Sequence, residues 1–297
     1  MNNYRHVPII QVDPVVLVDH PSDTGEGPLW DDVSNTLTWN DIPSGTLFRY
    51  DPAGRTNTVI YQHTGSIGGH TLQADGSLML FGDNGAIHKL GNGAAEVIVD
   101  EIPAVVGSRF NDVIADPLGN VFCGTMPLAH KPAQLFRLDV DGSLDLIWDD
   151  LGLGNGMGFS PDEKTFYHSD SNHRVVYRAD YADGELSNRN VLIRLDDEYA
   201  VPDGMTVDAA GDIWLAVWDG SSLLHYTATG ELIDRVMFPV RKVSSLSFGG
   251  IDFGTAFVTT AGGRNRDGDD GPLAGSLFAV TIPGVRGKSD YRSRILL

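Results

Sequence analysis

One pattern occurs six times along the chain: a polar residue opens a short apolar strand, a turn follows, and a second strand comes after the turn. The clearest copy is VPDGMTVDAAGDIWLAVWDG (residues 201–220), in which Asp203 precedes the first strand, residues 209–211 form the turn and residues 213–218 read as a buried strand. Successive opening residues lie 41–48 positions apart; they are Glu26, His70, Asn111, Asn155, Asp203 and Ser244. A repeat of about 40–45 residues is typical of one four-stranded β-propeller blade.

Six such repeats fill nearly all of the 297 residues, so little length remains for a second domain. The sequence therefore predicts an all-β fold, a six-bladed β-propeller with four-stranded antiparallel blades that forms a single domain over residues 1–297. Residues 1–14 are expected to form an N-terminal arm. Residues 15–19 read as a strand that completes the last blade, which would join the ends of the ring and remove an exposed edge. Residues 46–50, 135–139 and 175–179 are predicted as third strands of their blades.

Charge and cysteine content narrow the class of partner. The chain has 40 acidic and 21 basic residues and a net charge of −19, which argues against binding to nucleic acid or to an anionic membrane. The single cysteine, Cys123, cannot form an internal disulfide, which fits a reducing compartment. Neither an apolar signal segment near the start nor a run of 18 apolar residues occurs. We expect a cytoplasmic protein, monomeric or weakly homo-oligomeric, that binds a small molecule.

The opening residues suggest a cation site. The innermost strands of a propeller all begin at one end of the central tunnel, so these residues are expected to surround that end. Glu26 and Asp203 would supply two carboxylates, and Asn111 and Asn155 two amide oxygens. Such an oxygen-rich set suits a hard divalent cation, calcium first, and the cation would relieve repulsion between the carboxylates. The alternative for each residue alone is a turn former before a strand.

Two further residues are candidates for substrate contact. Arg109 precedes Asn111 by two residues, so both would face the same side of an extended segment and Arg109 could reach a polar ligand. The alternative for Arg109 is a salt bridge to an acidic loop. His70 is a candidate because of its place in the repeat. The GxSxG and HExxH motifs are absent, and the acidic loop at residues 267–271 lacks the spacing of an EF-hand.

Several short motifs run in one order along almost the whole chain, and together they carry a family resemblance. They are GEGPLW (residues 25–30), RFND (109–112), FCGTM (122–126), NGM (155–157), PDGM (202–205) and FGG (248–250). With these motifs the chain resembles the regucalcin–gluconolactonase family, which includes senescence marker protein, gluconolactonase and luciferin-regenerating enzyme. The family fold is a six-bladed propeller, in agreement with the repeat.

The resemblance implies a metal-dependent lactone hydrolase that opens a sugar lactone to its aldonic acid. It implies that Glu26, Asn155 and Asp203 bind one divalent cation and that Asp203 is also the catalytic base. It implies that Arg109 and Asn111 contact the lactone, with Asn111 also reaching the metal directly or through water. Calcium comes first, but oxygen ligands also accommodate Zn, Mg, Mn or Fe(II).

The chain departs from the family pattern at two places. Residues 127–131, PLAHK, contain no acid where animal members have acidic residues, and His70 stands at a position often held by other residues. Both departures leave the identity of the lactone open. Two alternative functions remain: a promiscuous esterase or organophosphate hydrolase on the same metal site, and a non-catalytic calcium-binding propeller. A polar ring with an arginine at its mouth favours an enzyme, because a scaffold does not need one.

Overall fold

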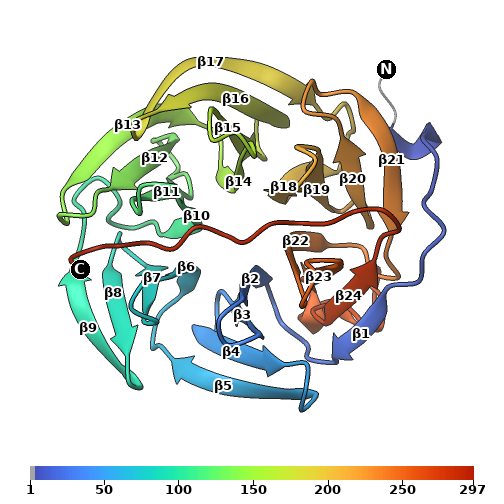
Figure 1. Cartoon of the computed structure of the whole chain (residues 1–297), viewed down its shortest axis with the longest axis horizontal. Helices are drawn as coiled ribbons and strands as arrows, with labels where there is room; N and C mark the ends of the chain where they lie inside the picture. Colours follow the sequence, from blue (N-terminus) through green and yellow to red (C-terminus); the bar gives the residue numbers. More distant parts are fainter. Residues whose placement is uncertain (1–3) are drawn as a thin grey trace.

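The structure, a computed structural model, describes residues 4–297 as six four-stranded antiparallel sheets arranged around a central axis (Figure 1). Within these residues the helical segments are two short 3₁₀ turns, η1 Tyr4–His6 and η2 Gly263–Asn265. None of the helices in residues 4–297 has the length and hydrophobicity needed to cross a membrane. The predicted six-bladed β-propeller is confirmed.

Five blades each use four consecutive strands, numbered from the axis outward. The first two are β2 Gly25–Asp31, β3 Thr36–Asp41, β4 Thr46–Asp51 and β5 Thr56–Gln62, then β6 Ile67–Leu72, β7 Leu78–Gly82, β8 Ile87–Gly91 and β9 Ala94–Val99. The third is β10 Phe110–Ala115, β11 Val121–Thr125, β12 Ala133–Leu138 and β13 Leu144–Leu151. The fourth and fifth are β14 Gly154–Phe159, β15 Thr165–Asp170, β16 Val175–Ala182 and β17 Glu185–Arg194, then β18 Val201–Val207, β19 Ile213–Trp218, β20 Ser222–Tyr226 and β21 Leu232–Met237.

The sixth blade joins the two ends of the chain. It consists of β22 Val243–Gly249, β23 Thr255–Thr260 and β24 Leu277–Thr281, and β1 Val15–Val18 pairs antiparallel with β24 as the outermost strand. This closure is the one that the sequence predicted, and it removes a free sheet edge at the point where the ring closes. Part of the preceding segment runs beside β21: the Ile10 amide donates to the Arg235 carbonyl at 2.8 Å and the Arg235 amide to the Pro8 carbonyl at 3.0 Å.

The hydrophobic cores lie between neighbouring blades. Because successive side chains of a strand point to opposite faces of its sheet, each blade presents one apolar face to each neighbour. Phe122 of β11 packs with Phe159 and Phe166 of the next blade in one such core. Burying a side chain of this size contributes about 1.5–3 kcal/mol relative to leaving it exposed. The cores therefore hold neighbouring blades together and fix the ends of the inner strands around the axis.

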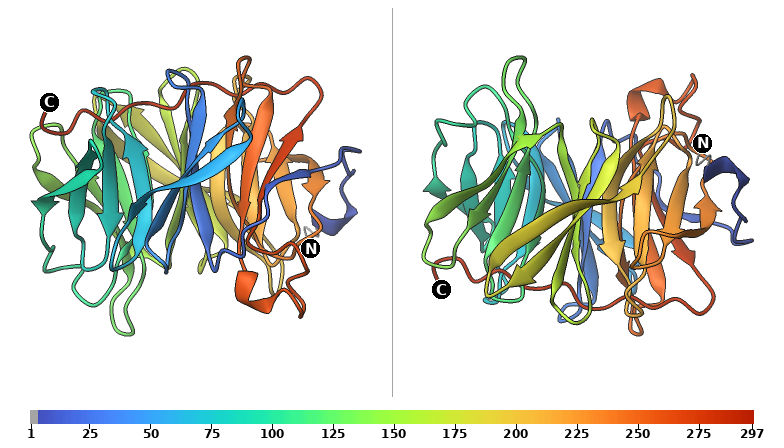
Figure 2. Two further views of the ribbon diagram at one scale, coloured as in Figure 1. Left: turned by 90° about the horizontal axis from the view of Figure 1, so that it is seen from below. Right: turned by 90° about the horizontal axis from the view of Figure 1, so that it is seen from above.

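A C-terminal strap, residues 283–297, crosses one face of the ring from blade six to the far side, and Figure 2 shows it lying along that face. It bonds to turns or strand ends of all six blades, and the pairs are Gly287 and Phe253, Arg286 and Ala209, Tyr291 and Glu163, Arg292 and Asp31, Ser293 and Leu72, and Arg294 and Gly119. Lys288, Asp290 and Tyr291 line a cavity of about 90 Å³ on the axis. The strap thus covers one end of the channel and leaves the other end for a site.

The strap should contribute measurably to stability. Ile295 is 1 % exposed and packs with core residues of blades two and three. Ile295→Ala should lower the free energy of unfolding by about 2–5 kcal/mol, the usual cost of emptying a buried isoleucine site. Leu297 is 60 % exposed, so Leu297→Ala should stay within about 0.5 kcal/mol of the parent. Denaturant titration of both variants measures the difference, and equal stabilities would mean that the strap does not pack as described.

One buried histidine should make stability depend on pH. His168 of β15 is fully buried beside Trp148 and Phe166, and neither ring nitrogen has a hydrogen-bond partner in the described part of the chain. Burial lowers the pKa of His168 to about 4, while Asp170 opposes the shift. An unfolded histidine takes up a proton near pH 6.5, whereas folded His168 does so only near pH 4. Acid therefore favours the unfolded state, and stability is lost as pH falls below about 6.5.

His168→Phe should remove this contribution, because phenylalanine has no proton to gain. The parent should lose up to about 1.4 kcal/mol more per pH unit than the variant between pH 6.5 and 4. Urea unfolding at several pH values gives the two slopes, and His130→Phe, at an exposed loop position, is the control. Parallel slopes for parent and His168→Phe would show that His168 is not held neutral.

Candidate functional site

Four inner strands carry a β-bulge at the polar residue that opens their repeat. The pairing register shifts between Glu26 and Leu29 in β2, between Phe110 and Val113 in β10, between Gly154 and Met157 in β14, and between Pro202 and Met205 in β18. A bulge bends the strand and redirects the side chains next to it. Four blades therefore use the same local device to aim one polar side chain at the axis.

These side chains meet in one cavity of about 230 Å³ at the end of the ring opposite the strap. Five of the six residues predicted for the site line this cavity: Glu26, Arg109, Asn111, Asn155 and Asp203. Apolar and small polar residues complete the lining; they are Ile42, Met126, Leu153, Val201 and Trp218, with Thr24, Ser171 and Asn172. None of this second group was predicted, because they come from strand ends and loops without a distinctive spacing.

A chain of hydrogen bonds fixes the amide groups of the site. Arg109 Nη1 donates to Asn111 Oδ1 at 2.7 Å, and Asn111 Nδ2 donates to Asn155 Oδ1 at 2.9 Å. Asn155 Nδ2 then donates to Ser171 Oγ at 2.9 Å, and Ser171 Oγ donates to the Pro202 carbonyl at 2.6 Å. The chain runs from blade three to blade five. It holds both amides in one orientation before any ligand binds, which is the arrangement a preorganised site requires.

Two buried carboxylates, Glu26 and Asp203, line this cavity, and Arg109 is the one basic residue among its lining residues. Burial raises the pKa of Glu26 well above its usual value, nearby Asp203 and Asp112 raise it further, and Arg109 opposes the shift. Burial and Asp112 likewise raise the pKa of Asp203, whereas Asn155 and Arg109 lower it. Sequence reasoning did not single out Asp112, although it follows Asn111 directly. The region holds more negative than positive charge, which is the condition that a bound cation relieves.

The donor set fits a divalent metal ion. Glu26 and Asp203 offer carboxylate oxygens and Asn155 offers an amide oxygen at the same cavity; the lining residues include no thiol or imidazole, and their one sulfur is the Met126 thioether. Hard cations such as Ca²⁺ and Mg²⁺ take oxygen ligands of this kind. The side-chain oxygens of Asn111 and Asn155 each accept one hydrogen bond, from Arg109 and from Asn111 respectively, and an amide oxygen has a second lone pair for a cation. Asn111 thus links the arginine to the ligand set.

The structure does not bring His70 into this cavity. In β6 the bulge falls between Ile67 and Gly69, so Gly68 holds the position equivalent to Asn111. His70, which the repeat placed at that position, lies two residues further along the strand. A Cβ at Gly68 would lie 2.0 Å from the Phe110 carbonyl oxygen, so no side chain fits there. His70 lines the axial cavity under the strap instead, with Nε2 at 2.8 Å from Thr38 Oγ1, and burial lowers its pKa to about 4. Ser244, the opening residue of the sixth repeat, uses its hydroxyl in the structure itself: Ser244 Oγ donates to the Gly25 carbonyl at 2.6 Å.

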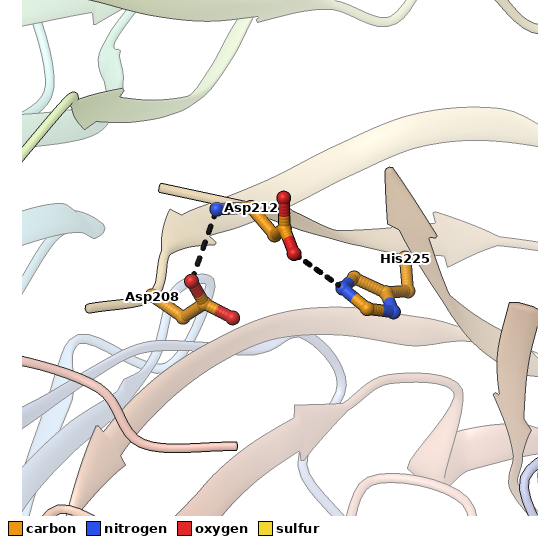
Figure 3. Close-up of side chains that lie close together, drawn as sticks. All are labelled: Asp208, Asp212 and His225. Atoms are coloured by element: carbon orange, nitrogen blue, oxygen red, sulfur yellow. Dashed lines mark hydrogen bonds and ion pairs between the residues drawn. The ribbon is translucent and has the colours of Figure 1, made fainter. Parts of the chain in front are cut away.

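A second group that could hold a metal lies in blade five (Figure 3). Donor atoms of Asp208, Asp212 and His225 fall within 4.8 Å of one another. Asp208 already accepts from the backbone amides of Ala210 and Asp212 and from Trp214 Nε1, all at 2.9–3.0 Å. His225 lies between Asp212 and Asp234 and stacks on Trp214. Because these side chains satisfy one another, the group explains the turn between β18 and β19 without a ligand.

The chain is similar to known proteins over almost its whole length. Residues 24–262 match the family model described as SMP-30/Gluconolactonase/LRE-like region. Pentonolactonase XacC of Haloferax volcanii is 40% identical over 95% of this chain and 98% of its own length, and human regucalcin is 32% identical over 90% and 93%. A solved structure of a calcium-binding protein, regucalcin from Agrobacterium tumefaciens, superposes with a TM-score of 0.88 at 25% identity, over 97% of this chain and 99% of that one. The chain belongs to the SMP-30/gluconolactonase/LRE-like family.

Proposed function

We propose that the protein is a metal-dependent lactone hydrolase that opens a sugar lactone to its aldonic acid. The observation that carries the proposal is the convergence of Glu26, Asn155 and Asp203 on one cavity that Arg109 and Asn111 also line. Relatives named pentonolactonase and 6-deoxy-6-sulfogluconolactonase support a sugar lactone as the substrate class. We expect one divalent cation per chain, with calcium first because the donors are oxygens and a relative is described as calcium-binding.

Glu26, Asn155 and Asp203 would hold the cation. When bound, it would supply Lewis acidity that polarises the lactone carbonyl and stabilises the oxyanion that develops as water adds. Asp203 can then use one carboxylate oxygen to take a proton from the attacking water. Collapse of the tetrahedral intermediate breaks the bond to the ring oxygen, and the proton passes to that leaving oxygen. The product is the open hydroxy acid.

Arg109 and Asn111 would position the substrate. Arg109 Nη1 is held against the Phe110 carbonyl and Asn111 Oδ1, at 2.8 and 2.7 Å, so the guanidinium has a fixed orientation beside the cavity. Its remaining donors can bind hydroxyl groups of the lactone ring by charge-assisted hydrogen bonds. The covalent step needs no group from these two residues.

The test is a substrate panel on chelated protein with each metal added back. Five- and six-carbon aldonolactones, a simple aryl ester and an organophosphate triester are compared for initial rates with Ca, Mg, Mn, Zn and Fe(II). The proposal expects the highest kcat/KM on aldonolactones and no turnover without added metal. A higher kcat/KM on the ester or triester would support the promiscuous hydrolase, and absence of any turnover with a tightly bound cation would support a binding protein.

A further inference from the structure

Trp218 is the aromatic side chain of the candidate cavity: in residues 4–297, no other aromatic residue lines it. It ends strand β19, directly before the turn into β20, and it is half-buried. The other apolar lining residues, Ile42, Met126, Leu153 and Val201, are aliphatic or a thioether. Because part of its surface faces the cavity, the indole offers a large, rigid apolar area next to the polar residues of the lining.

A clamp of charged residues holds this indole in place. The Lys242 ammonium lies over the Trp218 ring, 5.7 Å from its centroid. That ammonium is itself bound by Asp219 at 3.2 Å and by Asp270, and Arg241 Nε bonds to Asp219 at 2.8 Å. The three elements involved are the β19–β20 turn, the segment before β22 and the long β23–β24 loop. Because a cation over an aromatic ring is favourable, the clamp restricts the ring without placing any charge in the cavity lining.

The cavity lining has two chemical kinds of surface. Glu26, Arg109, Asn111, Asn155 and Asp203 supply charges and hydrogen bonds, whereas Trp218 supplies an apolar ring. A sugar lactone has the same two kinds of surface, since its carbonyl and hydroxyls are polar and the C–H bonds of its ring form an apolar face. The hydrogens of these C–H bonds carry a small positive charge, and the face of an aromatic ring, which carries negative charge density, attracts them. Few polar groups for orientation and an apolar surface for affinity are usual in small-molecule sites.

We propose that Trp218 is the platform on which the C–H face of the lactone ring rests and that it determines specificity for a ring lactone. The inference rests on the proposed function for the identity of the substrate. Trp218 contributes binding through its ring surface and takes no part in the proton transfers. Its replacement should therefore change KM and the affinity for ring analogues much more than kcat.

The test compares Trp218→Leu, which keeps an apolar side chain but no aromatic ring, with Trp218→Phe, which keeps an aromatic face. An aldonolactam, a ring analogue that resists hydrolysis, serves as the probe for calorimetric binding to metal-loaded protein. Trp218→Leu should raise the lactam Kd and the aldonolactone KM about tenfold or more, with kcat within about threefold. Trp218→Phe should stay within about threefold of the parent in all three. Thermal midpoints report whether each variant remains folded.

Lys242→Met removes the cation and keeps most of the aliphatic stem. It should raise the lactam Kd by a smaller factor than Trp218→Leu, because the indole remains but is less restrained. Equal losses for Trp218→Leu and Trp218→Phe, an unchanged Kd for a folded Trp218→Leu, or absence of lactam binding by the parent would each overturn the inference. A parent that binds the lactam through Trp218 but hydrolyses no lactone would overturn the proposed function alone.

Discussion

Asp203→Asn is expected to lower kcat for lactone hydrolysis by about 10²–10⁴, the usual scale for the loss of a general base. Asparagine keeps an oxygen at the position of the metal ligand but cannot accept the proton of the attacking water. Metal affinity should fall less than kcat, because one charged ligand, Glu26, and the Asn155 oxygen remain. Initial rates at saturating lactone and metal give the change in kcat, and metal titration gives the affinity.

The matched control is Asp183→Asn in the exposed turn between β16 and β17. The backbone φ of Asp183 is 50°, a left-handed conformation that asparagine also adopts readily. This control should leave kcat unchanged, because the residue is not part of the cavity lining. If Asp203→Asn retained near-full activity with metal bound, Asp203 would not be the base, and the cation would have to activate the water without it.

Removal of the cation is expected to abolish turnover and to lower the thermal midpoint, with both restored on adding the metal back. A ligand that binds only the folded state stabilises it by mass action, by about 2.7 kcal/mol at a concentration 100 times its Kd. Metal analysis should find one tightly bound ion per chain. Full activity after exhaustive chelation, with no metal detected, would contradict the assignment of the site.

Glu26→Gln tests the charge at this site, because it should change the stability of the protein in opposite directions without and with bound metal. Without metal, the variant should be more stable than the parent, because burial and nearby Asp203 and Asp112 disfavour the Glu26 carboxylate. With metal at a fixed concentration, the variant should gain less stability than the parent because it has lost a charged ligand. Thermal midpoints with and without calcium show whether the order of the two proteins reverses. The same order under both conditions would argue against Glu26 as a ligand.

The strand pattern by itself determined the architecture. A propeller blade is a local unit, in which each strand pairs with the next along the chain, so the alternation of residues and the turn after each strand carry the information. The repeat therefore predicted the six blades and the third strands at β4, β12 and β16. It also predicted the closure by β1, because an unpaired strand before the first repeat has its natural partner at the far end of the ring.

The sequence also placed five residues of the candidate site together, since equivalent positions in successive repeats meet at one end of the axis. It failed for His70, because the register of β6 depends on a bulge and on the close approach of the Phe110 carbonyl to Gly68. Both features arise from packing between neighbouring blades. The roles of the five residues in metal binding and catalysis stay predictions.

Only the tertiary structure decided what surrounds those residues. The C-terminal strap has no periodic pattern, and its partners are turns and strand ends far away in sequence, such as Leu72 for Ser293 and Asp31 for Arg292, which is 261 residues away. Ser171 reaches the site through hydrogen bonds to Asn155 and the Pro202 carbonyl, and Trp218 through the end of β19. A cavity lining depends on the placement of side chains from several blades to within about an ångström, whereas a repeat fixes only which strand each residue occupies.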